Sequence, residues 1–409
     1  MGHVSRTPGG KFRANWRDPA SRQRAKTFPT KREANAYLAQ IETAKNSGTY
    51  VSPHAGRVLF ADHARDWMAA RRTADTTTER DRSVMRTHVL PRWGAWPLAR
   101  VDEMSVQKWI TDLACRRSHA VVSKCLQLTA GVLRSAVRNR LIAVNPCDGV
   151  KLPSPRKQDT DDLVISRSDL GDALVPVVPA RHRALVAVTA GAGLRWGEAI
   201  GLCQDAVDLD HARLTVVRTV IEVNGVTSIK RFPKSSAGRR TIPLPSWVVE
   251  HLGEHVATYP PGAAGLLFAN EAGGALRRST FRSRVWRPAL VRAGLLGEVM
   301  CEDEWFEARW VDEAGEKHAQ RFDRYGHAVR HVARYCAGGL TFHDLRHSYA
   351  TWLVDDGVPP TMVMRVMGHE KVTTTLELYA RRTDDADRIL RALTDDDDDP
   401  DDSAPVGVR

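Results

Sequence analysis

Apolar and polar residues alternate near the N-terminus before the pattern changes to a helical one. Residues 11–18 alternate apolar with polar side chains, as a half-buried strand does, and residues 24–28 predict another strand. Thr30, followed three residues later by Glu33, is a capping-box signal that predicts the start of a helix. Residues 1–46 are therefore predicted to form a small module of a three-stranded sheet and one helix.

Residues 58–152 follow a helical period, because apolar side chains recur every three or four positions, as at Phe60, Ala64 and Trp67. Prolines interrupt this period and divide it into several helices. Stretches that contain glycine, serine or proline precede and follow the segment and are typical of linkers. The pattern predicts an all-helical domain.

A larger domain of mixed α+β structure is predicted over residues 163–393. Helical stretches there alternate with a strand-rich part at 213–244, where the pair Asn224-Gly225 signals a hairpin turn. The last residues, 394–409, are strongly acidic and are predicted to be disordered. The expected fold class is multidomain, mainly α with small β-sheets.

The chain contains an internal repeat, because residues 305–332 resemble residues 11–38 without a gap, at a constant offset of 294. The matching positions are Phe12, Ala14, Trp16, Asp18, Ala20, Ala25, Phe28 and Ala34, which recur as Phe306, Ala308, Trp310, Asp312, Ala314, Ala319, Phe322 and Ala328. We interpret residues 300–338 as a second β-β-β-α module inserted in the larger domain; the alternative is chance similarity. Residues 302–334 hold eight acidic and six basic side chains, which favours protein contact or positioning over tight phosphate binding.

The charge distribution points to a polyanionic partner. The net charge is +11 although seven aspartates lie within residues 395–402, so the rest of the chain is more basic still. Five basic residues of the N-terminal module are expected to project and to contact DNA, the alternative being a solvated basic face. They are Arg13, Arg17, Arg22, Arg24 and Lys26.

The sequence favours a protein of a reducing cytoplasm, because its six cysteines are scattered without close pairs. No run of about 18 apolar residues is present, so no membrane span is expected. The first 20 residues lack the apolar core of a secretory signal. His327 and His331 stand four residues apart, but without a paired-cysteine motif they are interpreted as surface histidines, and no metal is expected.

An ordered set of polar residues in the larger domain has the side chains that phosphodiester chemistry needs. A protein nucleophile keeps the bond energy of a cut phosphodiester in a covalent link, and arginine stabilises the negative transition state. The leaving oxygen needs a proton donor. The candidates, in chain order, are Arg195, Glu198, Lys234, His343, Arg346, His347, His369 and Tyr379. Each residue alone is a weak signal, so the order of the set carries the argument.

This ordered set resembles the tyrosine recombinase (phage-type integrase) family. Arg195 and Glu198 stand in a Gly-Leu-Arg-x-x-Glu box, and residues 343–347 read His-x-Leu-Arg-His. A Gly-His pair at 368–369 precedes Tyr379 by ten residues. One departure is the Ala-Gly pair before Leu-Arg, where many relatives have Thr-Gly, which should change packing and leave the chemistry intact.

The resemblance extends to the other domains and implies a role for the main site residues. The 58–152 segment resembles the family's core-binding domain, and the N-terminal module resembles its arm-binding module. Tyr379 would attack the scissile phosphate and form a 3′-phosphotyrosyl link, while Arg195 and Arg346 would bind the non-bridging oxygens. Lys234 would protonate the departing 5′-oxygen.

The remaining site residues would support these groups. His343 would assist proton transfer with the nucleophile, and His369 would donate a hydrogen bond to the phosphate. Glu198 would orient its neighbours, and His347 would be structural. No metal, ATP or other cofactor is implied, because the covalent link conserves the energy of the broken bond.

The resemblance also implies partners and a location. Double-stranded DNA with core and arm attachment sites would be the substrate, and a homotetramer would integrate or excise a mobile element in the synaptic complex. An excisionase and a host DNA-bending protein are candidate accessory partners, and the expected location is cytoplasmic, at the bacterial nucleoid. A catalytically idle DNA-binding regulator, a chromosome-dimer resolvase and a type IB topoisomerase remain as alternatives.

Overall fold

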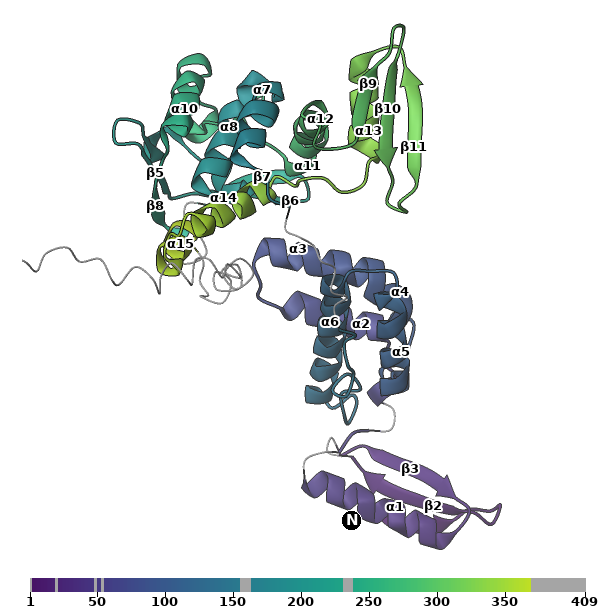
Figure 1. Ribbon diagram of the computed structural model, residues 1–409. Coiled ribbons are helices and arrows are strands. Elements are labelled where there is room, and N and C mark those ends of the chain that lie inside the picture. The colour runs from purple at the N-terminus through teal and green to yellow at the C-terminus, as the bar shows by residue number, and fades with distance from the viewer. Residues whose placement is uncertain are drawn as a thin grey trace, which may run out of the picture. The chain divides into compact units, whose positions relative to one another are not determined.

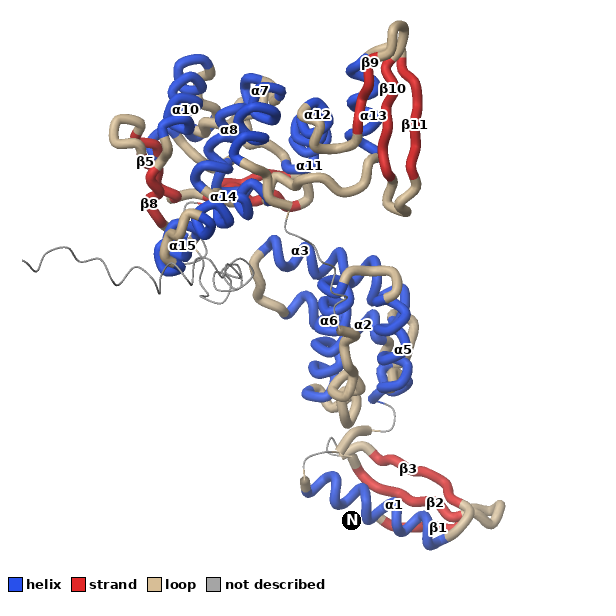
Figure 2. Tube along the Cα trace, viewed as in Figure 1, coloured by secondary structure: helices blue, strands red, loops and turns tan. Residues whose placement is uncertain are grey.

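The computed structural model describes residues 2–18, 21–47, 50–52, 55–154, 163–230 and 238–368 (Figure 1). The chain divides into two compact units, Met1–Gln158 and Asp159–Arg409. Helices predominate and the sheets are small (Figure 2), which confirms the predicted fold class. Within the described ranges, no helix is both long and apolar enough to cross a membrane.

A small sheet-and-helix module begins the first unit. Its elements are β1 (His3–Arg6), β2 (Phe12–Arg17), β3 (Gln23–Phe28) and α1 (Lys31–Asn46). The strands form an antiparallel sheet in chain order. The Thr30 side chain accepts a hydrogen bond from the Glu33 amide, and the Glu33 carboxylate accepts one from the Thr30 amide, so a capping box starts α1. Ala14, Trp16, Ala34, Leu38, Ile41 and Tyr50 form the core of the module.

The rest of the first unit is helical. Its helices are α2 (Phe60–Ala70), α3 (Asp75–Val84), α4 (Leu90–Trp93), α5 (Glu103–Ala114) and α6 (His119–Arg138), with a π-helical turn at Met85–Val89. Phe60, Trp93 and Leu98 are fully buried in a core of their own. The fully buried Asp81 carboxylate pairs with Lys124 at 2.8 Å, and this ion pair connects α3 to α6.

The second unit is built around α8, which is almost entirely buried. Its helices are α7 (Val175–Val177), α8 (Ala180–Ala192), α9 (Trp196–Ala199), α10 (Ser246–Thr258), α11 (Arg278–Phe281), α12 (Arg287–Arg292), α13 (Tyr325–Tyr335), α14 (Asp344–Asp355) and α15 (Pro360–Met367). Helix α8 carries apolar residues around its whole circumference and packs against α10 and α14 (Figure 1). This packing brings chain segments that lie far apart in the sequence to one end of α8.

Two short sheets flank these helices. Strands β4 (Val207–Asp208), β5 (Arg213–Val216) and β8 (Arg240–Pro243) form one antiparallel sheet, and β6 (Thr219–Val223) pairs with β7 (Val226–Lys230). The β-branched stretch at 213–221 thus divides between two sheets. Arg218, which lies at the division, donates two hydrogen bonds to the Asp205 carboxylate at 2.6 and 2.7 Å. Asn224 and Gly225 form the predicted turn, with φ of 52° and 75°.

A second sheet-and-helix module lies between α12 and α14. Strands β9 (Glu298–Cys301), β10 (Phe306–Val311) and β11 (Lys317–Phe322) form an antiparallel sheet, and α13 follows them. Phe306 pairs with Phe322 in this sheet as Phe12 pairs with Phe28 in the first, so the β10–β11 and β2–β3 hairpins share one register. The link between the first two strands is one residue shorter in the second module, where Cys301 pairs with Phe306 as Arg6 pairs with Phe12. Figure 1 shows α13 on the side of this sheet that faces α12.

Candidate active site

The first arginine of the site lies where α8 ends. Gly193 ends the helix in the left-handed conformation, with φ of 61°. A Cβ atom at this glycine would lie 2.4 Å from Cδ1 of Tyr349, so both the backbone conformation and the close packing require glycine here. The chain reverses at this point, and Arg195 becomes the N-cap of α9.

Glu198 accepts four hydrogen bonds from two arginines and is only 6% exposed. Its carboxylate accepts hydrogen bonds from the Arg195 backbone amide and from Nη1 of Arg195, both at 2.9 Å. Nη1 and Nη2 of Arg240 donate to the same carboxylate at 3.2 and 2.9 Å. Burial alone would raise the pKa of Glu198, but the hydrogen bonds and positive charges of Arg240 and Arg195 outweigh burial and lower it to about 2. The carboxylate is therefore ionised at neutral pH.

Arg346 reaches the site from the first turns of α14 and is only 3% exposed. Its Nη1 group donates to the carbonyl oxygen of Gly193, and its Nη2 group donates to that of Met367 at 2.5 Å. Burial and then the neighbouring Arg195 charge lower the pKa of Arg346 to about 9. The guanidinium still carries its charge at neutral pH and could be further stabilised by an anion.

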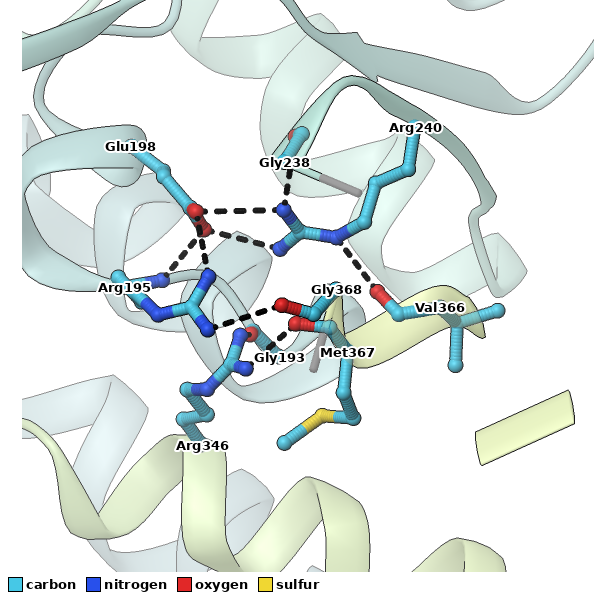
Figure 3. A network of polar contacts seen from close by, with 9 residues as sticks. All are labelled: Gly193, Arg195, Glu198, Gly238, Arg240, Arg346, Val366, Met367 and Gly368. Carbon is cyan, nitrogen blue, oxygen red and sulfur yellow. Dashed lines mark hydrogen bonds and ion pairs between the residues drawn. The ribbon is translucent and has the colours of Figure 1, made fainter. Parts of the chain in front are cut away.

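Three guanidinium groups meet at the C-terminal end of α15 (Figure 3). Arg240 Nε donates to the Val366 carbonyl at 2.6 Å, and Arg195 Nη2 donates to the Gly368 carbonyl at 3.1 Å. Together with the contact from Arg346, three successive carbonyl oxygens, those of residues 366–368, each accept from a different arginine. The C-terminal end of a helix carries partial negative charge, so the three cations stabilise it. We call Arg195, Arg240 and Arg346 the arginine cluster.

His343 lies one helical turn before Arg346, at the N-cap of α14. Its ring centroid is 4.9 Å from that of His347, in an edge-to-face arrangement. Desolvation by the surrounding protein, followed by the positive charge of His347 and of Arg346, lowers the pKa of His343 to about 4. The imidazole is therefore neutral at pH 7 and can accept a proton, as a general base must.

The structure brings together part of the predicted set. Arg195, Glu198 and Arg346 meet in one network, and His343 adjoins it. Three further predicted residues, Lys234, His369 and Tyr379, lie outside the described residues. The described chain ends at Gly368, which the arginine cluster holds and which directly precedes His369. Among the described residues, no three histidine, cysteine or acidic side chains form a group that could hold a metal ion.

Arg240 is a member of the site that the sequence interpretation missed. The sequence contains a pattern that could have identified Arg240 as buried. Along residues 240–244, in β8 and just after it, buried and exposed side chains alternate. Arg240, Ile242 and Leu244 are buried while the residues between them are exposed, so the arginine occupies a core position of a strand. A charged side chain at such a position requires a buried partner, which here is Glu198.

The basic residues of the N-terminal module differ in their surroundings. Arg13, Arg17 and Arg22 are exposed. Arg24 is partly buried and pairs with Asp18 at 3.1 Å, and Lys26 Nζ lies 4.7 Å from the ring centre of Tyr37, on the helix side of the sheet. Arg13, Arg17 and Arg22 are therefore better placed than Arg24 to contact a partner, and Lys26 is also exposed but lies beside Tyr37.

Two family models match parts of the chain. Residues 60–152 match the model of the phage integrase central domain, and residues 315–386 match that of the phage integrase family. The second match includes His343, Arg346 and the positions of His369 and Tyr379.

Curated relatives match along most of their length. The chain is 24% identical to the predicted prophage phiRv2 integrase of Mycobacterium tuberculosis (strain CDC 1551 / Oshkosh), over 96% of this chain and 94% of that protein. It is also 24% identical to an integrase of Streptomyces ambofaciens, over 89% of this chain and 87% of that one.

Solved structures share the fold. The Tn1549 transposon integrase in complex with transposon right end DNA has a TM-score of 0.60 and 19% identity, covering 82% of this chain and 99% of that one. A lambda integrase tetramer bound to a Holliday junction has a TM-score of 0.52 and 13% identity, covering 92% and 94%. The family models and the curated relatives confirm the predicted resemblance to the tyrosine recombinase (phage integrase) family.

Proposed function

We propose that this chain is a site-specific DNA recombinase, an integrase that cuts and rejoins DNA through a 3′-phosphotyrosyl intermediate on Tyr379. The observation that carries the proposal is the meeting of Arg195 and Arg346 beside the turn that leads to His369. Two arginines from distant elements can bind two non-bridging oxygens of one phosphate. Geometry of this kind favours phosphoryl transfer over simple DNA binding.

In the proposed reaction, the hydroxyl oxygen of Tyr379 attacks phosphorus and the bond from phosphorus to the 5′-oxygen breaks. Lys234 gives a proton to that departing oxygen, and His343, neutral at pH 7, assists removal of the tyrosine proton. His369 donates a hydrogen bond to the phosphate in the transition state. Attack of a new 5′-hydroxyl on the phosphotyrosyl bond reverses the step and rejoins the strands, so no metal, ATP or other cofactor is consumed.

The proposed domain roles follow the chain order. Residues 1–46 would bind arm sites, residues 58–152 and 163–393 would bind the core site, and the module at 300–338 would contact protein. A homotetramer is proposed because the lambda integrase that shares this fold is described as a tetramer on a Holliday junction. The proposed accessory partners are an excisionase and a host DNA-bending protein. The proposed location is the bacterial nucleoid.

The experiment that tests the proposal traps the covalent intermediate. Duplex fragments of the DNA that flanks the gene carry a nick beside each candidate cleavage position, so that the cut end diffuses away and the adduct accumulates. Wild type, Tyr379→Phe and Tyr335→Phe are compared on a denaturing gel. Tyr335 is a suitable control because it is 47% exposed, on α13.

The pattern of adducts distinguishes a recombinase from a catalytically idle regulator. An adduct with wild type and Tyr335→Phe, but not with Tyr379→Phe, supports the proposed recombinase. An adduct that persists in Tyr379→Phe assigns the nucleophile to another residue. Clear DNA binding without an adduct on any fragment, with and without host extract, favours a catalytically idle regulator.

A further inference from the structure

The three members of the arginine cluster differ in how many of their N–H groups the protein uses. A guanidinium has five N–H donors. Arg195 and Arg346 each make two hydrogen bonds to described residues, one from each Nη group. Arg240 makes four, to Glu198 twice and to the carbonyl oxygens of Gly238 and Val366. Arg240 therefore has little capacity left for a phosphate, whereas the other two keep donors for one.

Arg240 is also much less exposed to solvent than Arg195. The Arg195 side chain is 42% exposed, while the Arg240 side chain is 4% exposed, beneath the network. Figure 3 shows Arg240 between Glu198 and the end of α15, with its guanidinium in contact with both. It thus connects the box that carries Arg195 to the C-terminal turn of α15, which Gly368 separates from His369.

The positive charge of Arg240 also contributes to the net charge of the site. The arginine cluster and Glu198 together carry a net charge of +2, which suits a site that stabilises an anionic phosphate. Without Arg240 the net charge falls to +1 and the buried carboxylate is left with Arg195 alone. Neutralising Arg240 and Glu198 together restores +2, so the pair can be tested as a unit.

We propose that Arg240 is a positioning residue of the strand-cleavage site, which holds Glu198 and the C-terminal end of α15 so that Arg195 and Arg346 present their remaining N–H groups to a DNA phosphate. This inference rests on the proposed recombinase function. Arg240 itself touches neither the DNA nor the reacting atoms. It acts through Glu198 on Arg195, and through Val366 on the turn before His369.

The test compares two substrates that differ in one charge. The nicked duplex carries at the cleavage position either the natural phosphate or a methylphosphonate, in which a methyl group replaces one non-bridging oxygen and removes the negative charge. Adduct formation is measured in a single turnover with full-length Arg240→Gln, Glu198→Gln, Arg240→Lys and the double variant Arg240→Gln/Glu198→Gln. A variant that has lost phosphate stabilisation is slowed on the charged substrate and recovers on the neutral one.

Arg287→Gln is the matched control. Arg287 is 8% exposed in the same unit, and its guanidinium donates to the carbonyl oxygens of Ala333, Cys336 and Gly338 at the end of α13. It is thus another buried arginine that caps a helix, but at a different helix end. Its substitution reports the effect of lost stability alone, and all rates are divided by the folded fraction of each variant.

The expected result is a loss of about 10–100-fold for Arg240→Gln on the phosphate substrate and a clearly smaller loss on the methylphosphonate. Arg240→Lys, which keeps the charge but cannot span Glu198 and Val366, should lie between wild type and Arg240→Gln. The double variant should recover part of the rate, because it restores the net charge. Arg287→Gln should show equal losses on both substrates.

Two results overturn the inference. Equal losses for Arg240→Gln on both substrates would make Arg240 structural only, as would a double variant that is slower than the product of the single effects. If Arg240→Gln does not fold, Arg240→Lys carries the same comparison. Absence of an adduct from wild type is a separate result that contradicts the proposed function, whereas failure of the inference requires a wild type that cleaves.

Discussion

Replacing Glu198 by glutamine tests whether one buried carboxylate holds the candidate site together. The substitution keeps the shape of the side chain but removes the negative charge to which Arg195 and Arg240 donate. The Arg240 side chain is 4% exposed, so its guanidinium would remain buried beside a neutral amide. We expect the second unit to lose stability while it keeps its fold.

Two estimates of the loss agree. The pKa of Glu198, about 2 in place of 4.5, corresponds to about 3 kcal/mol in favour of the ionised carboxylate in the folded protein. Removing one partner of a buried ion pair costs about 3–5 kcal/mol, and glutamine keeps part of this because its carbonyl oxygen still accepts a hydrogen bond. We therefore expect a loss of about 3 kcal/mol, which lowers the Tm of a unit of this size by about 6–12 °C.

The pH dependence gives an independent check. The folded state holds the Glu198 proton more weakly than the unfolded state does, so the stabilisation is complete above the unfolded-state pKa. It is lost as the pH falls from there through the folded-state pKa of about 2. The difference in Tm between wild type and Glu198→Gln should stay constant from about pH 7 to about pH 5 and shrink below about pH 4.

Calorimetry of the full-length chain measures these values, and Asp81→Asn assigns the transitions. Asp81 is fully buried in the first unit and pairs with Arg71 and Lys124, so its substitution should shift only the transition of that unit. A loss below about 1 kcal/mol for Glu198→Gln would refute the reasoning. A difference in Tm that stays unchanged down to about pH 3 would also refute it, because the carboxylate would then not be the source.

Three further predictions concern the glycine turn, the arginine that is proposed to bind phosphate and the N-terminal module. Gly193→Ala should cost about 1–3 kcal/mol in urea unfolding, because residue 193 has a φ of 61° and a Cβ atom would lie 2.4 Å from Tyr349; an unchanged midpoint would contradict this. Arg346→Lys should slow single-turnover adduct formation by about 100-fold, because a compact ammonium lacks the planar fork with which Arg346 reaches Gly193 and Met367 and still presents N–H groups to a phosphate. A wild-type rate would show that Arg346 does not stabilise the phosphate. Arg13→Gln and Arg17→Gln should each reduce by about 1 the slope of log affinity against log salt concentration in anisotropy titrations with arm DNA, and an equal slope would show that these exposed side chains do not meet phosphates.

Local signals predicted much of the fold, because they act over a few residues. The capping box at Thr30 and the turn at Asn224 are determined by side chains within four positions of one another. The stretch at 213–221 was harder, because its β-branched residues suit a strand along their whole length. Its division between two sheets coincides with Arg218, which pairs with Asp205.

The candidate site likewise depends on contacts between distant residues, which local sequence patterns do not predict. Arg195, Glu198 and Arg346 were identified from motif order, and their meeting in one network depends on α8 and α14 packing together. Arg240 belongs to no motif in the predicted set, and its partner lies 42 residues away. Only its alternation with Ile242 marked it as buried, and a pattern that identifies a buried charge does not name the partner.

The two sheet-and-helix modules share a backbone fold but differ in which side of the helix is buried. In the first, Asn35 of α1 is exposed and the apolar side of the helix covers its own sheet. At the matching position of α13 stands Val329, which is fully buried and belongs to the core of the second unit. The buried side of α13 is thus wider than that of α1, and α13 packs against α12, while β10 and β11 keep the register of β2 and β3. Because the acidic residues of the inserted module outnumber its basic ones, we expect its sheet to bind phosphate less well than the sheet of the first module.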